Sequence, residues 1–178
     1  GEISPPPGTC LCGLYIAAFR HDNVVNISTL LATALIRIKT KYGWSENIRV
    51  LIDQGSVASF ITERAAKQLD LKQNSNYINI SGIAGSTETA KSTVDLQLTA
   101  RYPTSFRSNV TAIVMSKLTA FLPTKDFDKS MMQTNELEVL TLADPDFNKS
   151  ARIDMILGAD VYTEKRSWQG NLSVGFQR

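Results

Sequence analysis

The sequence has few of the residues that cross-link a small secreted protein or bind a metal ion. Its 178 residues include 2 cysteines and 1 histidine. A single residue separates Cys10 from Cys12, so a disulfide between them would be strained, and two cysteines cannot form a disulfide framework. We therefore expect a reducing, intracellular setting, with the cytoplasm as the default compartment.

Long apolar runs and an excess of one charge are also lacking. The early apolar run from Cys10 to Phe19 falls short of the roughly 20 residues of a membrane span. It follows three prolines instead of a basic region, so we expect no signal peptide and no membrane partner. The 19 Lys and Arg residues nearly balance the 17 Asp and Glu residues. This balance does not favour direct nucleic-acid binding by the domain, which needs a clustered basic face.

What remains is the composition of one folded domain, with 43% hydrophobic and 20% charged residues. Residues 1–29 are interpreted as a linker or extension, because Pro5-Pro6-Pro7-Gly8 favours an extended backbone. Residues 30–163 carry the periodic patterns of the domain, and residues 164–178 form a divergent C-terminal tail.

Period-two alternation of apolar and polar residues predicts several short strands within the domain. The segment 110–115 is apolar on both faces, which predicts a central strand. A helix is expected from an N-cap at Ser59 to about Asp70, because apolar residues recur there at helical spacing. The sequence therefore predicts a mostly β barrel or sandwich with one or two short helices.

One turn stands out as a candidate for chemistry. The apolar residues Val50-Leu51-Ile52 lead into Asp53-Gln54-Gly55-Ser56. A carboxylate that follows a buried strand and precedes a glycine turn can lie at the floor of a cleft. The alternative is an aspartate that opens an ordinary turn.

Two further segments carry glycines in strand-like surroundings. Gly82-Ile83-Ala84-Gly85 suits the tip of a hairpin, which is either a lid over a cleft or a plain β-turn. Ile156-Leu157-Gly158 allows two backbone segments to pack closely, and Asp160 is interpreted as a structural acid that fixes a buried loop.

Taken in order, these segments resemble the retropepsin-type aspartic protease domain of the Pao/BEL class of retrotransposons. The resemblance covers roughly residues 30–163 and rests on six ordered matches. They are Leu51–Ser56, Ser59–Glu63, Ile80–Gly85, Leu118–Pro123, Leu142–Phe147 and Ile153–Tyr162.

The resemblance implies a closed β-barrel and an aspartic endopeptidase that processes a polyprotein or peptide substrate. It assigns catalysis to Asp53, with Gln54, Gly55 and Ser56 as the active-site turn and Ser56 orienting Asp53. It assigns a substrate-binding flap to Gly82, Ile83, Ala84 and Gly85, and structural support to Ile156, Leu157, Gly158 and Asp160. It implies no metal and no organic cofactor.

The chain has one Asp-x-Gly turn, whereas this chemistry needs two carboxylates. The second is therefore expected from Asp53 of another copy, across a two-fold axis. Two features depart from the family: Gln54 stands where the family has Thr or Ser, and the tail after Tyr162 differs from the strands that join shorter retropepsins.

Two other functions stay open at this stage. A retropepsin fold that has lost activity can serve as a dimerisation or adaptor module, and Gln54 favours that alternative. Cys10, Cys12 and His21 could be the remnant of a zinc knuckle, but their spacing does not fit the C-x₂-C pattern.

Overall fold

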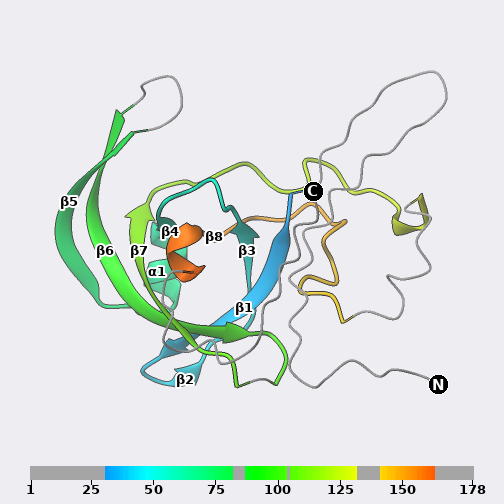
Figure 1. Ribbon diagram of the computed structural model, residues 1–178, viewed down its shortest axis with the longest axis horizontal. Coiled ribbons are helices and arrows are strands. Elements are labelled where there is room, and N and C mark those ends of the chain that lie inside the picture. The colour runs from blue at the N-terminus through cyan, green and yellow to red at the C-terminus, as the bar shows by residue number, and fades with distance from the viewer. Residues whose placement is uncertain (1–30, 82–86, 104, 132–140, 163–178) are drawn as a thin grey trace, which may run out of the picture.

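The computed structural model describes residues 31–81, 87–103, 105–131 and 141–162. Within them the protein is mostly β, as expected, with one short α-helix (Figure 1). The strands are β1 (Thr33–Thr40), β2 (Gly43–Trp44), β3 (Ile48–Ile52), β4 (Ser59–Thr62), β5 (Gln73–Ser81), β6 (Thr87–Ala100), β7 (Ser108–Met115) and β8 (Met155–Leu157). The helix is α1 (Glu63–Gln68), and the 3₁₀ turns are η2 (Lys129–Met131) and η4 (Ala159–Tyr162).

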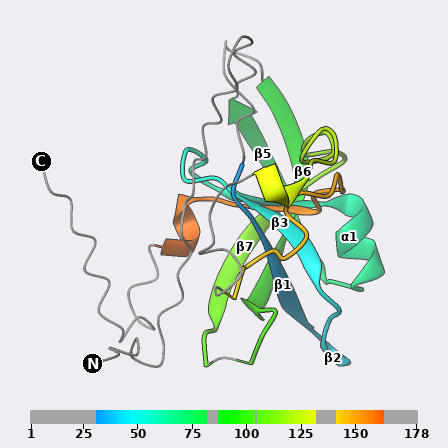
Figure 2. The same cartoon turned by 90° about the vertical axis from the view of Figure 1, so that its right-hand side faces the viewer.

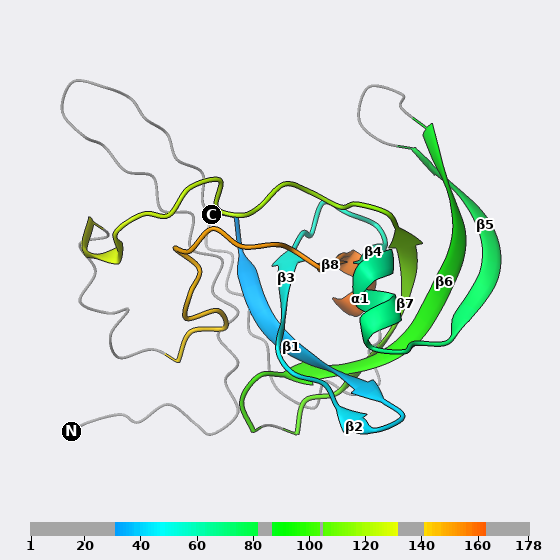
Figure 3. The same cartoon turned by 180° about the vertical axis from the view of Figure 1, so that it is seen from behind.

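All eight strands belong to one sheet, in the order β2-β1-β3-β8-β4-β7-β6-β5. β1 also pairs with β6, from Ile36 opposite Ala100 to Ile38 opposite Leu98. The pairings therefore run from β1 through β3, β8, β4, β7 and β6 and return to β1, and Figure 3 shows the sheet curving accordingly. The segment 110–115 lies in β7, between β4 and β6, which confirms the prediction of a central strand.

The core lies inside this curved sheet. Alternate residues of β1 and β6 contribute to it, and Ile38, Val50, Ile61, Val94 and Met155 are completely buried there. This alternation is the period-two pattern of the sequence, so burial of the apolar face accounts for the strand positions.

The expected helix start at Ser59 is wrong. Residues Ser59–Thr62 form β4, which pairs in parallel with β7 and antiparallel with β8. The helix begins after Thr62, whose hydroxyl accepts a hydrogen bond from the Ala65 amide at 3.2 Å. A short apolar run such as Phe60-Ile61 fits helix and strand equally well, and only its distant pairing partners decide between them. α1 then lies on one side of the sheet (Figure 2).

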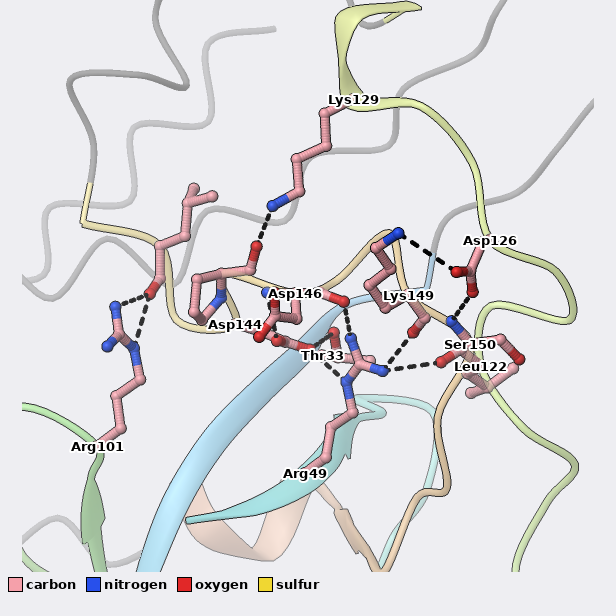
Figure 4. A network of polar contacts seen from close by, with 12 residues as sticks. Thr33, Arg49, Arg101, Leu122, Asp126, Lys129, Asp144, Asp146, Lys149 and Ser150 are labelled. Carbon is pink, nitrogen blue, oxygen red and sulfur yellow. Dashed lines mark hydrogen bonds and ion pairs between the residues drawn. The ribbon is translucent and has the colours of Figure 1, made fainter.

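A cluster of hydrogen bonds attaches the segment between β7 and β8 to β3 (Figure 4). Its centre is Arg49, whose Nε donates to Asp144 Oδ2 at 2.5 Å; the two residues are 7% and 4% exposed. The same guanidinium donates to the carbonyl oxygens of Leu122, Asp146 and Lys149. The Thr33 hydroxyl and the Asp146 amide donate to the Asp144 carboxylate, so both buried charges are well supplied with hydrogen bonds.

Among the described residues, no helix has both the length and the apolar character needed to cross a membrane.

Candidate active site

β3 leads directly into the tight turn that holds Asp53. The Asp53 amide donates to the Leu157 carbonyl of β8 at 3.0 Å, which continues the sheet pairing one residue past β3. The Gly55 amide donates to Asp53 Oδ1 at 3.0 Å, and the Ser56 amide donates to the Asp53 carbonyl at 3.2 Å. One carboxylate oxygen is therefore fixed by the backbone, while Oδ2 accepts no hydrogen bond from the described part of the chain.

The glycine of this turn keeps one side of the carboxylate clear. A Cβ atom at Gly55 would lie 3.2 Å from Asp53 Oδ1. Asp53 is half-buried, whereas Gln54 and Gly55 are exposed. The turn therefore presents a held carboxylate toward solvent, where a second molecule can approach it.

β8 lies between the two strands that flank the turn. It pairs in parallel with β3, with Ile156 opposite Leu51, and antiparallel with β4, with Ile156 opposite Phe60. The chain leaves the sheet at β3, makes the Asp53 turn and re-enters at β4, on the other side of β8. The turn is therefore anchored at both ends to the same inserted strand.

Gly158 follows β8 and packs directly against the turn. A Cβ atom there would lie 2.4 Å from the Ala58 carbonyl oxygen and 2.8 Å from that of Ser56. The next amide, that of Ala159, donates to the same Ser56 oxygen at 2.8 Å. Only glycine allows so close an approach of two backbone segments.

Asp160 joins the two sides of this arrangement. Its carboxylate accepts hydrogen bonds from the Ser59 amide at 3.1 Å and from the Ser59 hydroxyl at 2.7 Å. Ser59 is completely buried, and its Oγ also accepts from the Gly158 amide at 3.0 Å. These contacts attach β4 to the segment after β8. Asp160 therefore has a structural role, as the sequence indicated.

Ser56 does not orient the Asp53 carboxylate within this chain, contrary to the expectation. Its hydroxyl donates instead to the Ala58 carbonyl at 2.7 Å and so tightens the turn itself. The carboxylate oxygen of Asp53 is held by the Gly55 amide, which a search for side-chain donors overlooks.

The expected flap residues Gly82, Ile83, Ala84 and Gly85 lie outside the described residues. The strands on either side of them are described, and β5 and β6 pair antiparallel up to Ser81 opposite Thr87. Of the other expected supports, Leu157 is buried in the core cluster and Ile156 is partly buried.

Within the described ranges, the buried or partly buried acids near β8 have partners other than Asp53. Asp144 is paired with Arg49, and Asp154 is paired with Arg64 and accepts from the Thr62 hydroxyl. Neither Asp144 nor Asp154 is therefore placed to pair with the Asp53 carboxylate.

Features that could form another kind of site do not involve the Asp53 turn. A shallow surface depression is lined by residues of β1, β6 and β7, among them Lys39, Asp95 and Asn109, and it does not include Asp53. The described residues also contain no group of three His, Cys, Asp or Glu side chains that could hold a metal ion.

Comparison with models of known protein families gives no match, and comparison with curated proteins gives none either. The assignment of a function therefore depends on the geometry of the turn and on the resemblance of the sequence.

Sequence reasoning missed the network around Arg49. A signal was present, because an arginine in the middle of Ile48-Arg49-Val50-Leu51-Ile52 interrupts an apolar strand. Such a residue, once buried, needs an acid as partner, but nothing in the sequence pointed to Asp144, which lies 95 residues away.

Proposed function

We propose that this chain is one half of a homodimeric aspartic endopeptidase of the retropepsin type. The observation that carries the proposal is β8 inserted between β3 and β4, with Gly158 packed against the Asp53 turn. This arrangement holds a partly exposed carboxylate on rigid backbone, as a reacting group requires. The return of the strand pairings to β1 supports the closed barrel expected for this class.

In the proposed dimer, the two Asp53 side chains meet across a two-fold axis. Two carboxylates about 3 Å apart cannot both ionise, so they share one proton. The ionised member removes a proton from a water molecule, while the protonated member polarises the carbonyl of the scissile peptide bond. The water attacks that carbonyl, and the resulting tetrahedral intermediate collapses with protonation of the leaving amine.

The glycine at position 55 serves this chemistry directly. With no side chain there, a partner carboxylate can approach Oδ1 of Asp53 from the exposed side of the turn. The flap, assigned by resemblance to Gly82–Gly85, would close over an extended peptide that adds as a strand. A Pao/BEL-type retrotransposon origin and an intracellular polyprotein substrate are parts of the same proposal.

The test is cleavage of a peptide library by the purified chain between about pH 4 and pH 7. We expect cleavage that rises and then falls with pH, as for a pair of carboxylates that share a proton. Asp53→Asn should abolish it. The matched control is Asp146→Asn, because Asp146 is exposed and its contact with Arg49 uses the backbone carbonyl. Equal cleavage by wild type and Asp53→Asn would overturn the proposal.

The second candidate is a dimerisation or adaptor module without activity. Gln54 favours it, because its side chain is longer than the Thr or Ser of the family and the residue is exposed in the single chain. This candidate predicts that wild type and Asp53→Asn dimerise equally well and that neither cleaves any peptide.

A further inference from the structure

Cationic and aromatic side chains gather at the end of the sheet opposite to Asp53. The register of β1 with β3 puts Thr33 beside Leu51, next to the Asp53 turn. The other end of β1 pairs with β2, with Lys39 opposite Trp44. Figure 1 shows β2 and the C-terminal end of β6 at the lower end of the molecule, away from the connection between β3 and β4.

Two cations lie over one indole ring in this region. Lys39 Nζ is 5.3 Å from the centroid of the Trp44 ring, and the Arg107 guanidinium carbon is 4.8 Å from it. Nearby, Lys41 Nζ is 4.9 Å from the centroid of the ring of Tyr42, a residue that is 83% exposed. We call Lys39, Lys41, Tyr42, Trp44 and Arg107 the basic aromatic surface.

Arg37 adds a cation that pairs with no carboxylate among the described residues. Its Nε is buried and finds no hydrogen-bond acceptor within the described ranges. Neither Arg37 nor Lys39 forms an ion pair with a carboxylate among those residues. Burying a donor without an acceptor is costly, so the position of Arg37 carries a cost that the described residues do not offset.

Arg37 also lies beside the basic aromatic surface. It is opposite Thr99 in the pairing of β1 with β6, and the Arg107 guanidinium donates to the Thr99 hydroxyl at 2.8 Å. Side chains two residues apart on a strand share a face, so Arg37 and Lys39 lie on the same side of β1. Arg37, Lys39 and Arg107 therefore lie close together around Thr99 and Trp44.

Two of the three acids in this region already have partners within the protein. Asp70 pairs with Lys41, and Asp95 accepts hydrogen bonds from Thr111 and Asn74. Glu46, two residues after Trp44, is exposed. The region thus holds four cations and three acids, and the two cations without a carboxylate partner among the described residues, Arg37 and Lys39, lie on the same side of β1.

Amide side chains border the same surface. Lys39 lines a shallow depression together with Gln97 and Asn109, and these two amides hydrogen-bond each other at 3.2 Å. In a nucleic acid, amides can bind the edges of the bases, aromatic rings can stack on the faces of the bases, and cations can bind the phosphates. An acidic peptide would use the cations alone.

We propose that the basic aromatic surface binds single-stranded nucleic acid. The backbone phosphates contact Lys39, Lys41 and Arg107, with Arg37 beneath them, and a base stacks on Tyr42. This site is separate from Asp53 and does not depend on the peptidase activity. The proposal departs from the expectation based on overall charge, because that expectation took no account of how the cations are distributed.

The test is fluorescence anisotropy of a labelled single strand, about 20 nucleotides long, with the full 178-residue chain at about 50 to 200 mM KCl. Each phosphate contact to a single strand contributes about −0.7 to the slope of log K against log salt, so the three contacting cations predict a slope of about −2. The triple variant Lys39→Ala/Lys41→Ala/Arg107→Ala should bind at least about tenfold more weakly, with a slope near zero.

The matched control removes the same charge elsewhere. Lys91, Lys117 and Lys125 are exposed and lie outside the basic aromatic surface, so their triple alanine variant should bind as wild type does. Tyr42→Ala should weaken binding about tenfold without changing the salt slope, because stacking carries no charge. Circular dichroism verifies that every variant keeps its fold.

Three outcomes would overturn the proposal. The first is equal binding by the two triple variants. The second is equal affinity for a duplex of the same sequence, which would remove the role of stacking. The third is displacement of the oligonucleotide by polyglutamate at matched charge concentration, which would indicate an acidic peptide as the ligand.

Discussion

Gly158 and Gly55 both lie at the Asp53 turn, and the space around them differs. At Gly158 a Cβ atom would meet two backbone carbonyl oxygens, at 2.4 and 2.8 Å, so the backbone itself would have to move. At Gly55 it would meet a side-chain oxygen at 3.2 Å. We expect Gly158→Ala to destabilise the fold by about 3 kcal/mol, at the upper end of overpacking costs.

Urea unfolding of the two variants tests this difference. Gly55→Ala should lower the free energy of unfolding by less than Gly158→Ala, yet it should impair cleavage because it crowds the carboxylate. Equal stability of Gly158→Ala and wild type would show that Gly158 does not pack against the turn as described.

The carboxyl of Asp126 makes the stability of the protein depend on pH through a single residue. The hydrogen bond from the Ser150 amide lowers the pKa of Asp126 below its ordinary value of 3.8, and Lys149 acts in the same direction. A carboxyl whose pKa is lower in the folded state stabilises the fold above its ordinary pKa. That contribution is lost as the pH falls through the lowered value.

Asp126→Asn should therefore weaken the dependence of unfolding free energy on pH below about pH 4 and leave the dependence near neutrality unchanged. The effect is small because the carboxyl is exposed. Thermal unfolding at closely spaced pH values measures it. An unchanged pH dependence below pH ~4 in the variant would contradict the assignment.

At the scale of elements, the Arg49–Asp144 pair joins β3 to the segment that precedes β8. Both side chains are buried, so removing one leaves an unpaired buried charge, which costs about 3–5 kcal/mol. We expect Arg49→Met and Asp144→Leu each to destabilise the protein by about 4 kcal/mol.

The double variant should lose less than the sum of the two single variants, because no charge is then left unpaired. A double-mutant cycle by urea unfolding measures this coupling. If the two losses simply add, the residues do not interact in the folded protein.

The strands show how far local pattern determines structure. Alternation accounts for β1 and β6, because one face of each lies in the core, and the doubly apolar segment 110–115 was recognised as the strand β7. Local pattern failed for Ser59–Thr62, because the apolar run there fits helix and strand alike and the choice depends on β7 and β8. The glycine motif after β8 was recognised, but the insertion of β8 between β3 and β4 depends on pairing between distant segments, which no local pattern encodes.

The candidate site was predictable to a similar extent. Asp53, Gly55 and Gly158 were recognised from apolar residues beside glycine, which is a local signal. The hydrogen bond from the Gly55 amide to Asp53 and the contact between β4 and Asp160 were not, since they depend on backbone geometry or on distant residues. The basic aromatic surface also escaped notice, because Arg107 lies far in sequence from the other residues of that surface.

At the scale of the whole molecule, the proposal requires two chains to form one active site. The size of Gln54 affects that association directly, since the retropepsins that the sequence resembles use a small hydroxyl at this position to join the two turns. We expect Gln54→Thr to strengthen dimerisation by about tenfold, the value of one or two additional hydrogen bonds. Sedimentation at several protein concentrations measures the dissociation constant. A weaker dimer would show that Gln54 itself makes the contact.

The most direct test of a shared site is the binding stoichiometry of a statine-containing peptide, which mimics the tetrahedral intermediate of peptide hydrolysis. Transition-state mimics bind the assembled site far more tightly than substrates do. We expect one inhibitor bound per two chains, a doubling of the mass in solution when it binds, and no binding by Asp53→Asn. One inhibitor bound to each monomer, or equal binding by Asp53→Asn, would contradict a site shared between two chains.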